Sequence, residues 1–311
     1  MSAKPERRRL GRTGLEVSVL GFGGAEVGFL ETDRREVAAL LNALLDAGVN
    51  LIDTAAKYGG SEDAIGEAVG HRRDDYLLVS KCGEALDGIE GAAWSAGCIT
   101  RTIDRSLQRL RTDRLDVMLL HSCDLEVLQA GEALGALVAA RDAGKLRYLG
   151  YSGDNETVAY AAGLEEVAVI EASINLCDQA NIATALPAAR AHDVGVLAKR
   201  PIANAAWKAA AERRGLYVDY AQSYEERLRK MAIAPEDLGF AAEDWPEIAL
   251  RFTLSQPDVG SAIVGTTRQA TVARNLAAAA KGPLPPGILA ALRDAFRRAE
   301  TADGAPWPGL R

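Results

Sequence analysis

The segment LIDTAAKYGGSEDAIGEAVG, residues 51–70, begins as an apolar run and continues as an amphipathic helix pattern. Ile65, Ala68 and Val69 recur at the i, i+3, i+4 spacing of one helix face. Ser61 stands where a capping side chain would begin that helix. A strand that passes directly into a helix is the repeating unit of α/β proteins, so the fold depends on whether this unit recurs.

The same alternation of strand and helix runs through the chain of 311 residues. Eight short apolar runs are predicted to be strands, at 17–23, 49–54, 76–81, 115–121, 145–152, 167–174, 194–200 and 260–265. They are almost continuously apolar, which is typical of parallel strands covered on both faces. Helical patterns occupy 33–47, 61–69, 97–110, 125–142, 155–162, 179–192, 245–255 and 288–300. Eight such units predict a single (β/α)8 TIM barrel, as one domain spanning residues 1–311.

Two segments stand outside this repeat. Residues 7–20, RRRLGRTGLEVSVL, place a turn sequence between two short runs and predict an N-terminal β-hairpin. Residues 201–244 form a long loop after the seventh strand, and loops of this length are usually functional. A Rossmann domain is the competing architecture. Its glycine fingerprint would end at Glu26, where a carboxylate would repel a pyrophosphate, so the barrel is favoured.

Composition narrows the class of protein. The net charge of −7 argues against a general nucleic-acid surface. The four cysteines have neither disulfide-framework nor zinc-ligand spacing, which suits a reducing compartment. No run of about 18 apolar residues occurs, and no signal-peptide core follows the basic start MSAKPERRRL. We therefore expect a cytoplasmic protein that binds neither nucleic acid nor a membrane.

Polar residues stand at the ends of several predicted strands. In a parallel barrel the carboxyl ends of all strands meet on one face, where barrel enzymes carry their active sites. Asp53 ends the second strand, Lys81 the third and His121 the fourth, and Tyr58 follows the second strand. Taken singly, these could be a turn cap, a solvated amine, a core histidine and a packed ring. Together on one rim they form a coherent proton-transfer site.

The chemistry of these four groups suits reduction of a carbonyl. A tyrosine with an ordinary pKa of about 10 is a poor acid–base group near neutrality. Lys81 would favour the phenolate and lower the pKa of Tyr58, while Asp53 would hold Lys81 in place. His121 would donate a hydrogen bond to the carbonyl oxygen and orient the substrate. Because no side chain supplies a hydride, the site implies a nicotinamide cofactor.

These motifs resemble those of the aldo-keto reductase family, which are NAD(P)H-dependent (β/α)8-barrel oxidoreductases. The similar segments are GRTGLEVSVLGFGG (hairpin and first strand), residues 51–69 (Asp/Tyr motif), VSKCG (lysine strand) and RSLQRLRTDRLDVMLLHSCD (helix and histidine strand). The similarity runs in order from about Arg9 to Asn275. It implies a catalytic tetrad that interconverts an aldehyde, ketone or sugar carbonyl and an alcohol, consisting of Asp53, Tyr58, Lys81 and His121.

The resemblance also implies nicotinamide contacts, with departures from the family pattern. A Ser-Asn pair and a Gln bind the carboxamide in the family, where this chain has Ser152, Gly153 and Glu171. An ionised Glu171 accepts hydrogen bonds but cannot donate them. Lys199 and Arg200 replace the family's stacking aromatic residue. Arg200 could stack on the nicotinamide or contact the pyrophosphate, and the alternative is that both are solvated rim charges.

Residues 265–275, GTTRQATVARN, are similar to the family segment that holds the adenosine 2′-phosphate. The lysine of many members is replaced by Gly265, but two threonines and two forked guanidinium groups remain to bind phosphate. We therefore favour NADP(H), with NAD(H) as the alternative. The expected contacts are Gly265, Thr266, Thr267, Arg268 and Arg274, with Asn275 beside the adenine and the backbone of Gly24 and Ala25 near the ribose.

The substrate is expected to be a small carbonyl compound or alcohol, and the sequence leaves the oligomeric state open. Candidate wall residues, each equally compatible with ordinary loop packing, are Trp94, Trp207, Tyr217, Tyr220 and Tyr224. One rival function is a cofactor-binding regulatory protein with little turnover, which the departures at the cofactor positions keep open. Another is a metal-dependent barrel enzyme, disfavoured because the three histidines lack ligand spacing. No metal site is expected.

Overall fold

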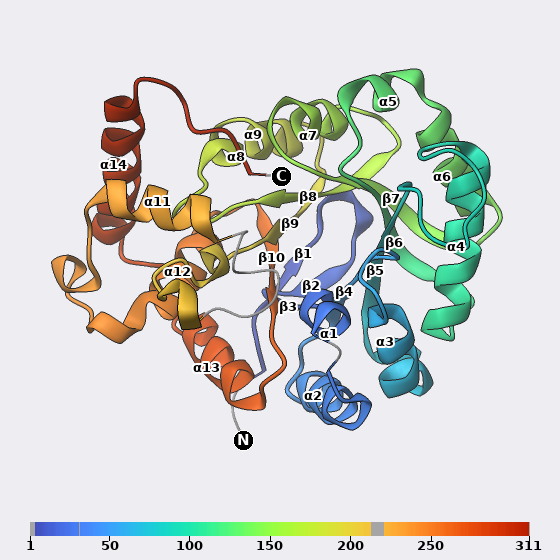
Figure 1. The fold of residues 1–311 in the computed structure, drawn as a ribbon, viewed down its shortest axis with the longest axis horizontal. Coiled ribbons are helices and arrows are strands. Elements are labelled where there is room, and N and C mark those ends of the chain that lie inside the picture. Colours follow the sequence, from blue (N-terminus) through green and yellow to red (C-terminus); the bar gives the residue numbers. More distant parts are fainter. Residues whose placement is uncertain (1–3, 31, 213–220, 311) are drawn as a thin grey trace.

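The computed structural model describes residues 4–30, 32–212 and 221–310. Its centre is a closed barrel of parallel strands surrounded by helices, and an antiparallel hairpin precedes it (Figure 1). The strand order β10-β3-β4-β5-β6-β7-β8-β9 means that strands consecutive in the chain are neighbours, and β10 closes the barrel on β3. The predicted (β/α)8 barrel with its N-terminal hairpin is confirmed, and the Rossmann alternative is wrong.

The barrel strands match the predicted runs, with one exception. Predicted strand 17–23 divides, because Glu16–Ser18 (β2) pairs antiparallel with Arg7–Arg9 (β1) in the hairpin. The barrel strands are β3 (Leu20–Gly23), β4 (Leu51–Asp53), β5 (Leu77–Cys82), β6 (Leu115–His121), β7 (Leu146–Ser152), β8 (Val167–Ser173), β9 (Gly195–Lys199) and β10 (Val259–Gly265).

The helices differ from the prediction in two ways, because two predicted helices divide and several helices were not predicted. The predicted helix 179–192 divides at Thr184 into α8 and α9. The predicted helix 125–142 breaks at Gly131, whose φ of 76° is left-handed. Within the described part of the chain, three α-helices were not predicted: α1, α11 inside the expected long loop, and α13. The helices are α1 (Ala25–Phe29), α2 (Arg34–Asp46), α3 (Ser61–Val69), α4 (Ala96–Leu110), α5 (Leu125–Ala130), α6 (Glu132–Asp142), α7 (Asn155–Ala162), α8 (Ala180–Ala183), α9 (Ala185–Ala191), α11 (Gln222–Met231), α12 (Trp245–Leu254), α13 (Gln269–Ala280) and α14 (Pro286–Asp303). Among the described residues, no helix combines the length and apolar character needed to cross a bilayer.

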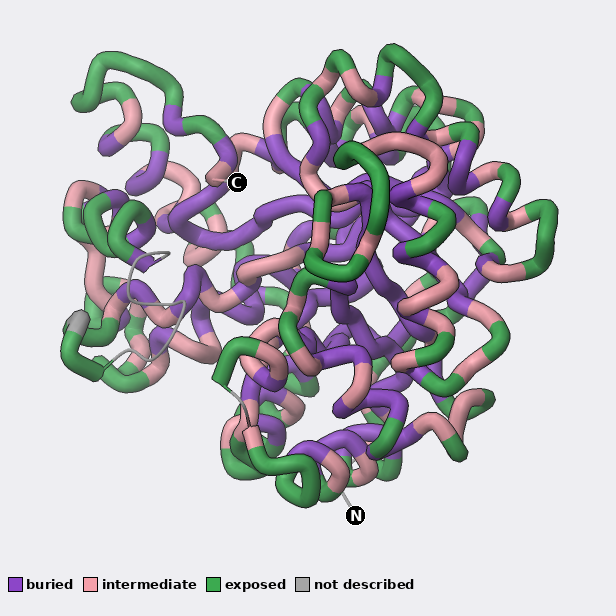
Figure 2. Tube along the Cα trace, turned by 45° about the vertical axis from the view of Figure 1, so that its right-hand side comes forward, coloured by how far each residue is buried: buried purple, intermediate pink, exposed green. Residues whose placement is uncertain are grey.

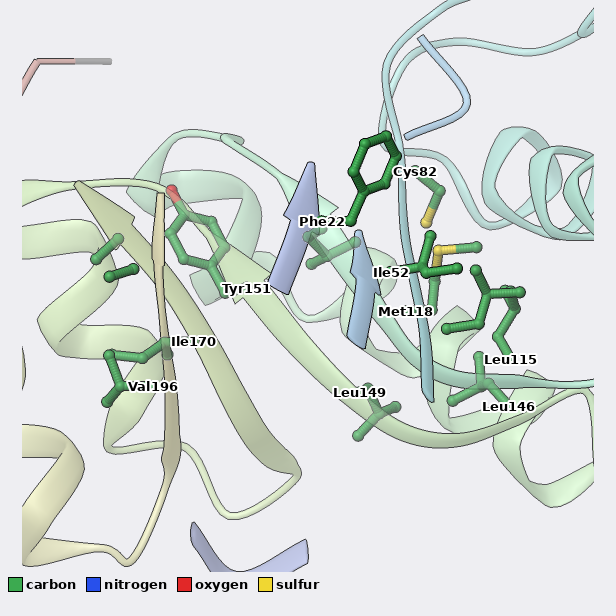
Figure 3. Close-up of a cluster of buried hydrophobic side chains, with 14 of the residues drawn as sticks. Phe22, Ile52, Cys82, Leu115, Met118, Leu146, Leu149, Tyr151, Ile170 and Val196 are labelled. Carbon is green, nitrogen blue, oxygen red and sulfur yellow. The ribbon is translucent and has the colours of Figure 1, made fainter. Parts of the chain in front are cut away.

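Alternation along each strand divides the apolar side chains into two layers. The outward side chains join the surrounding helices in one large cluster; Figure 3 shows members of it such as Ile52, Met118 and Ile170. A separate cluster contains side chains of the barrel strands and the hairpin, including Leu51, Val79 and Leu119, and fills the inside of the barrel. Figure 2 shows the resulting gradient, with buried strands at the centre and exposed positions on outer helices and loops. The inward positions therefore decide what reaches the barrel's interior.

The hairpin closes the amino-terminal end of the barrel. Leu10, Leu15 and Val17 of the hairpin belong to the interior cluster. At Gly11, a Cβ would lie 2.2 Å from the backbone nitrogen of Gly195, so this close approach requires glycine. With that end plugged, the opposite rim is the open end at which side chains can meet a ligand.

Helix α3 begins differently from its expected capped start. Ser61 is the first helical residue, and the preceding residue provides no side-chain cap. The Ser61 hydroxyl donates instead to the carbonyl oxygen of Gly24 at 2.8 Å and lies 2.9 Å from the Thr54 hydroxyl. The predicted cap is therefore wrong. Ser61 ties α3 to the loops after β3 and β4, which places the segment carrying Tyr58.

Candidate active site

Successive barrel strands end in polar or charged side chains that follow interior apolar residues. Asp53 comes two residues after Leu51 on β4, and Lys81 two residues after Val79 on β5. The same two-residue step leads from interior leucines or valines to His121 on β6, Glu171 on β8 and Lys199 on β9. Because side chains alternate along a strand, this spacing directs all of them to the inside of the carboxyl-end rim.

Lys81 is the centre of the arrangement. Its side chain is fully buried, and its Nζ donates to Asp53 Oδ1 at 2.5 Å and to the Thr54 carbonyl oxygen at 3.0 Å. The same Nζ lies 3.3 Å from Glu171 Oε2, so two carboxylates share one ammonium. Burial by itself would lower the pKa of Lys81, but the surrounding Asp53 and Glu171 carboxylates raise it above its ordinary value. Lys81 is therefore a fixed cation at neutral pH.

Tyr58 and His121 complete the predicted group of four. Lys81 Nζ lies 5.4 Å from the centroid of the Tyr58 ring. The Tyr58 and His121 rings meet edge to face, with centroids 5.7 Å apart and planes inclined by 79°. On its other side, Tyr58 lies 5.7 Å from the ring of Phe29 of α1. The structure thus brings the predicted tetrad together on one rim.

The expected pKa of Tyr58 is wrong in direction. Burial of the phenol disfavours its charged form and raises its pKa to about 12. Lys81 does lower it, as expected, but Asp53 and Glu171 oppose that effect. The sequence argument considered the ammonium alone and omitted both the loss of solvent and the second carboxylate. Tyr58 is consequently a protonated phenol at neutral pH, suited to donate a proton.

Glu171 lies where the resemblance places a carboxamide-binding residue, but it contacts the tetrad as well. Besides its approach to Lys81, its Oε1 accepts from the Ser152 hydroxyl at 3.5 Å. Burial and then Glu171 raise the pKa of Asp53. Burial also opposes ionisation of Glu171, but Lys81 and then Lys199 lower its pKa. The two buried carboxyls therefore disfavour each other's ionisation, while the ammonium of Lys81 favours the charged form of both.

Lys199 and Arg200 have partners on the rim, so they are not merely solvated charges. Lys199 Nζ lies 3.0 Å from Oδ2 of the fully buried Asp154. Arg200, at a left-handed φ of 55°, donates to the Leu310 carbonyl oxygen at 2.5 Å. That oxygen also accepts from the Ser173 hydroxyl at 3.2 Å. The C-terminal segment thus lies against the ends of β8 and β9, as Figure 1 shows for the chain end beside β8.

The predicted phosphate-binding segment forms the turn from β10 into α13. Thr266 Oγ1 accepts from the Arg268 backbone N–H at 3.1 Å, and Arg268 is the residue before the helix. The first turn of α13 contains no acidic residue. Thr267 is half-buried, the Arg268 and Arg274 side chains are exposed, and Gly265 ends the strand. A positive helix end with nearby guanidinium groups suits an anion.

Three other predicted contacts have specific places. Asn275 is buried on α13. The Gly24 N–H donates to the Asp53 carbonyl oxygen at 2.8 Å, and the Gly24 carbonyl oxygen accepts from Ser61. These backbone groups of Gly24 are therefore already engaged, whereas Ala25 begins α1.

The candidate wall residues do not form one group. Trp94 packs over Gly83 beside the lysine strand, where a Cβ on that glycine would lie 2.1 Å from the indole. Trp207 stacks on Trp245 of α12, with centroids 6.1 Å apart, beside a further apolar cluster that joins α11, α12 and α14. Tyr224 is fully buried and donates to Asp178 Oδ2 at 3.0 Å. Tyr217 and Tyr220 lie outside the described residues. For Trp207 and Tyr224, the packing explanation accounts for the observed contacts.

Sequence reasoning missed Glu84, two residues beyond the end of β5. Its Oε2 lies 3.1 Å from His121 Nδ1, and its Oε1 accepts from Lys57 Nζ at 2.6 Å. Its position directly after the lysine strand was the only available signal. Within residues 4–30, 32–212 and 221–310, no group of three or more His, Cys, Asp or Glu side chains is placed to hold a metal.

Comparison with known proteins identifies the family. The sequence model described as the Aldo/keto reductase family matches residues 19–295, most of the chain. The chain belongs to the aldo-keto reductase family. This membership agrees with the barrel, its hairpin and the assembled tetrad, and it makes the protein an oxidoreductase that interconverts carbonyl and alcohol groups.

Individual relatives share about a quarter to a third of the aligned residues with this chain. It is 29% identical to the Bacillus subtilis (strain 168) oxidoreductase YqkF, covering 88% of this chain and 90% of the relative. It is 27% identical to L-galactose dehydrogenase of Arabidopsis thaliana, with 88% of each chain covered. Among solved structures, the holo form of an aldo-keto reductase from Bacillus halodurans superposes with a TM-score of 0.77 at 25% identity, covering 94% of this chain and 96% of that one.

Proposed function

We propose that this aldo-keto reductase uses NADPH to reduce an aldehyde, ketone or sugar carbonyl, and catalyses the reverse oxidation, with Tyr58 as general acid–base. The observation that carries the proposal is the buried Lys81, held by Asp53 at 2.5 Å and 5.4 Å from the Tyr58 ring centroid. A fixed cation beside a phenol is an arrangement that stabilises a phenolate as it forms. We place this reaction in the cytoplasm, because all four cysteines are free and buried.

Each of the four side chains has a defined task in this mechanism. The nicotinamide, when bound, supplies or accepts a hydride at the reacting carbon. Tyr58 donates its phenolic proton to the carbonyl oxygen, and Lys81 stabilises the phenolate that remains. Asp53 holds Lys81 in position through their ion pair. His121, edge to face with Tyr58, orients the substrate oxygen.

The residues around this rim fit a dinucleotide phosphate. The unopposed amino-terminal end of α13, with Thr266, Thr267, Arg268 and Arg274, supports binding of a phosphate there. At the other end of the site, Ser152 and Glu171 face the same rim as Lys81 and offer a hydroxyl and a carboxylate to a carboxamide. The ionised Glu171 would accept from the carboxamide NH2. We assign Asn275 to the adenine side and Lys199 and Arg200 to the rim near the pyrophosphate.

Arg268→Ala should weaken NADPH binding by about tenfold or more and leave NADH binding within a few-fold, because a forked guanidinium pairs with the 2′-phosphate that only NADPH carries. Cofactor fluorescence titration would measure both dissociation constants. The control is Arg298→Ala, which removes the same charge from an exposed arginine of α14. Equal weakening of NADPH and NADH would exclude Arg268 as the reader of the 2′-phosphate.

The substrate class is tested by offering aldehydes, ketones and sugars with each cofactor in both directions. We expect the purified protein to oxidise NADPH with reactive aldehydes, without added metal. Cofactor binding without turnover on any member of the panel would favour the regulatory alternative. Loops bordering the tetrad are expected to select among substrates, through Phe29 of α1 and Trp94 after β5.

Gly28→Ala should lower turnover by about tenfold or more, because small displacements of a reacting group are costly in rate. A Cβ at Gly28 would lie 1.8 Å from the backbone oxygen of Tyr58, so α1 and the Tyr58 loop must separate. Steady-state kinetics and thermal unfolding would be compared with Gly135→Ala on α6, where a Cβ meets nothing within 4 Å. Unchanged turnover in Gly28→Ala would mean that contact with α1 does not position Tyr58.

A further inference from the structure

Glu84 forms a charged bridge between two elements of the site. Its carboxylate contacts Lys57 Nζ at 2.6 Å through one oxygen and approaches His121 Nδ1 to 3.1 Å through the other. Lys57 directly precedes Tyr58, and His121 ends β6. Glu84 therefore joins the loop of the proton donor to the strand of the histidine, yet it touches neither Lys81 nor Asp53 in any recorded contact of the described chain.

The approach of this carboxylate favours a proton on one particular nitrogen of His121. Burial alone would raise the pKa of Glu84, but His121 and then Lys57 hold it below its ordinary value, so the carboxylate is ionised. A carboxylate oxygen 3.1 Å from a ring nitrogen is stable only if that nitrogen carries a proton, since two acceptors repel. Nδ1 of His121 is then the protonated nitrogen. Nε2 is the nitrogen left for a substrate oxygen.

This placement changes what His121 can do in the proposed reaction. A neutral imidazole protonated on Nδ1 presents a lone pair at Nε2, so it accepts a hydrogen bond and cannot donate one. It can donate from Nε2 only after gaining a second proton. Orientation of a carbonyl oxygen, which is an acceptor, therefore needs the imidazolium, whereas an alcohol hydroxyl suits the neutral ring.

We propose that Glu84 is a positioning residue for His121. The Glu84 carboxylate keeps a proton on Nδ1 of the ring, and it is the counter-ion of the imidazolium that binds the carbonyl oxygen through Nε2. This inference rests on the proposed carbonyl reduction. Glu84 acts through His121 and does not itself touch the substrate. Its carboxylate offsets the cost of holding a charged imidazolium in a largely buried position. Lys57 limits the effect by neutralising part of the Glu84 charge.

The other charges around His121 set the direction of each effect. Burial lowers the pKa of His121 overall, Lys81 from β5 lowers it further, and Glu84 and Glu171 raise it. Tyr58, which faces the ring, stays protonated below its pKa of about 12. Because the pKa of His121 lies below its ordinary value, loss of reductase activity as the pH rises through the mildly acidic range would report deprotonation of His121 and not of Tyr58.

NMR titration of the protein tests the inference without turnover. The chain has three histidines, so the signal of His121 can be followed beside His71 and His192 as internal references. Glu84→Gln, which keeps the shape and removes the charge, should lower the His121 pKa by about one unit or more. Lys57→Met should raise it, because Glu84 is then no longer neutralised. Ring 15N chemical shifts should show that the neutral imidazole of His121 carries its single ring N–H proton on Nδ1 in the unmodified protein.

Kinetics in the same variants test the consequence for the reaction. The alkaline limit of aldehyde reduction should move to lower pH in Glu84→Gln and to higher pH in Lys57→Met, with NADPH affinity unchanged in both. The inference would be overturned by an unchanged His121 pKa in Glu84→Gln. It would also be overturned if the neutral His121 ring carried its proton on Nε2. Shifts of the same sign in the two variants, or an alkaline limit that does not follow the His121 pKa, would overturn it as well. Absence of any reductase activity would count against the proposed function, while the NMR result would still decide the coupling of Glu84 to His121.

Discussion

Tyr58→Phe is expected to lower kcat for aldehyde reduction by about 10²- to 10⁴-fold, the usual contribution of a positioned acid–base group. The variant removes one oxygen atom and keeps the ring that packs between Phe29 and His121. Burial and the nearby Lys81 are therefore preserved, and the proton donor alone is lost. Single-turnover measurements with NADPH and a reactive aldehyde would separate the chemical step from cofactor release.

Binding controls distinguish this effect from a damaged site. NADPH affinity, measured by fluorescence, should stay within a few-fold in Tyr58→Phe, because the assigned cofactor contacts do not involve the hydroxyl. Tyr160→Phe on α7, at a side chain 39% exposed, is the matched control and should leave turnover unchanged. If Tyr58→Phe retained normal turnover, Tyr58 could not be the proton donor.

Lys81→Met should abolish measurable turnover and also destabilise the fold by about 3–5 kcal/mol near neutral pH, the range for breaking a buried ion pair. Methionine nearly fills the volume of the lysine stem, but it leaves Asp53 and Glu171 facing each other without the ammonium that both now contact. Urea unfolding at a series of pH values would measure the loss.

The pH dependence of that loss has a defined sign. Without Lys81, the folded-state pKa values of both carboxyls rise above their unfolded values of about 4. A raised folded-state pKa gives stability that is present below the unfolded value and lost as pH rises. The stability gap between the variant and the unmodified protein should therefore be smallest near pH 4–5 and widen towards pH 8.

Lys145→Met provides the comparison at the surface. Lys145 pairs with Asp104 at 2.5 Å, but both side chains are about a third or more exposed, so the expected loss is only about 0–1 kcal/mol. A loss in Lys81→Met that is equally small, or that does not depend on pH, would show that Asp53 and Glu171 do not depend on the ammonium for their burial.

The raised pKa of Tyr58 bears on the direction of the reaction. A phenol that keeps its proton to about pH 12 is ready to donate in reduction across the physiological range. Oxidation of an alcohol needs the phenolate as acceptor, and burial together with Asp53 and Glu171 disfavours that form. We therefore expect the state of Tyr58 to favour reduction over oxidation wherever His121 is also protonated, as assays in both directions across a pH series would test.

Much of the fold could be predicted from the sequence because its signals are local. Apolar runs of a few residues marked the barrel strands, and the turn at residues 12–14 marked the hairpin. The errors arose where local signals are ambiguous. Glycine ends one helix at Gly131, and the alanine-rich α13 was hidden within a segment interpreted for its phosphate-binding side chains. Serine is a common helix-capping residue, but the Ser61 hydroxyl contacts Gly24 and Thr54 in other loops instead of capping α3.

By itself, the sequence determined the barrel, its hairpin and the four side chains that meet at one rim, because strand period and strand ends are properties of neighbouring residues. Only the tertiary structure decided the electrostatics of that rim. It brought Glu171 from β8 to the ammonium of Lys81, and Glu84 to the ring of His121. It also surrounded the phenol of Tyr58 with protein groups that reduce its solvation, which reversed the expected direction of its pKa shift. Charge interactions and desolvation depend on distances between residues far apart in the chain, and only the closed barrel sets those distances.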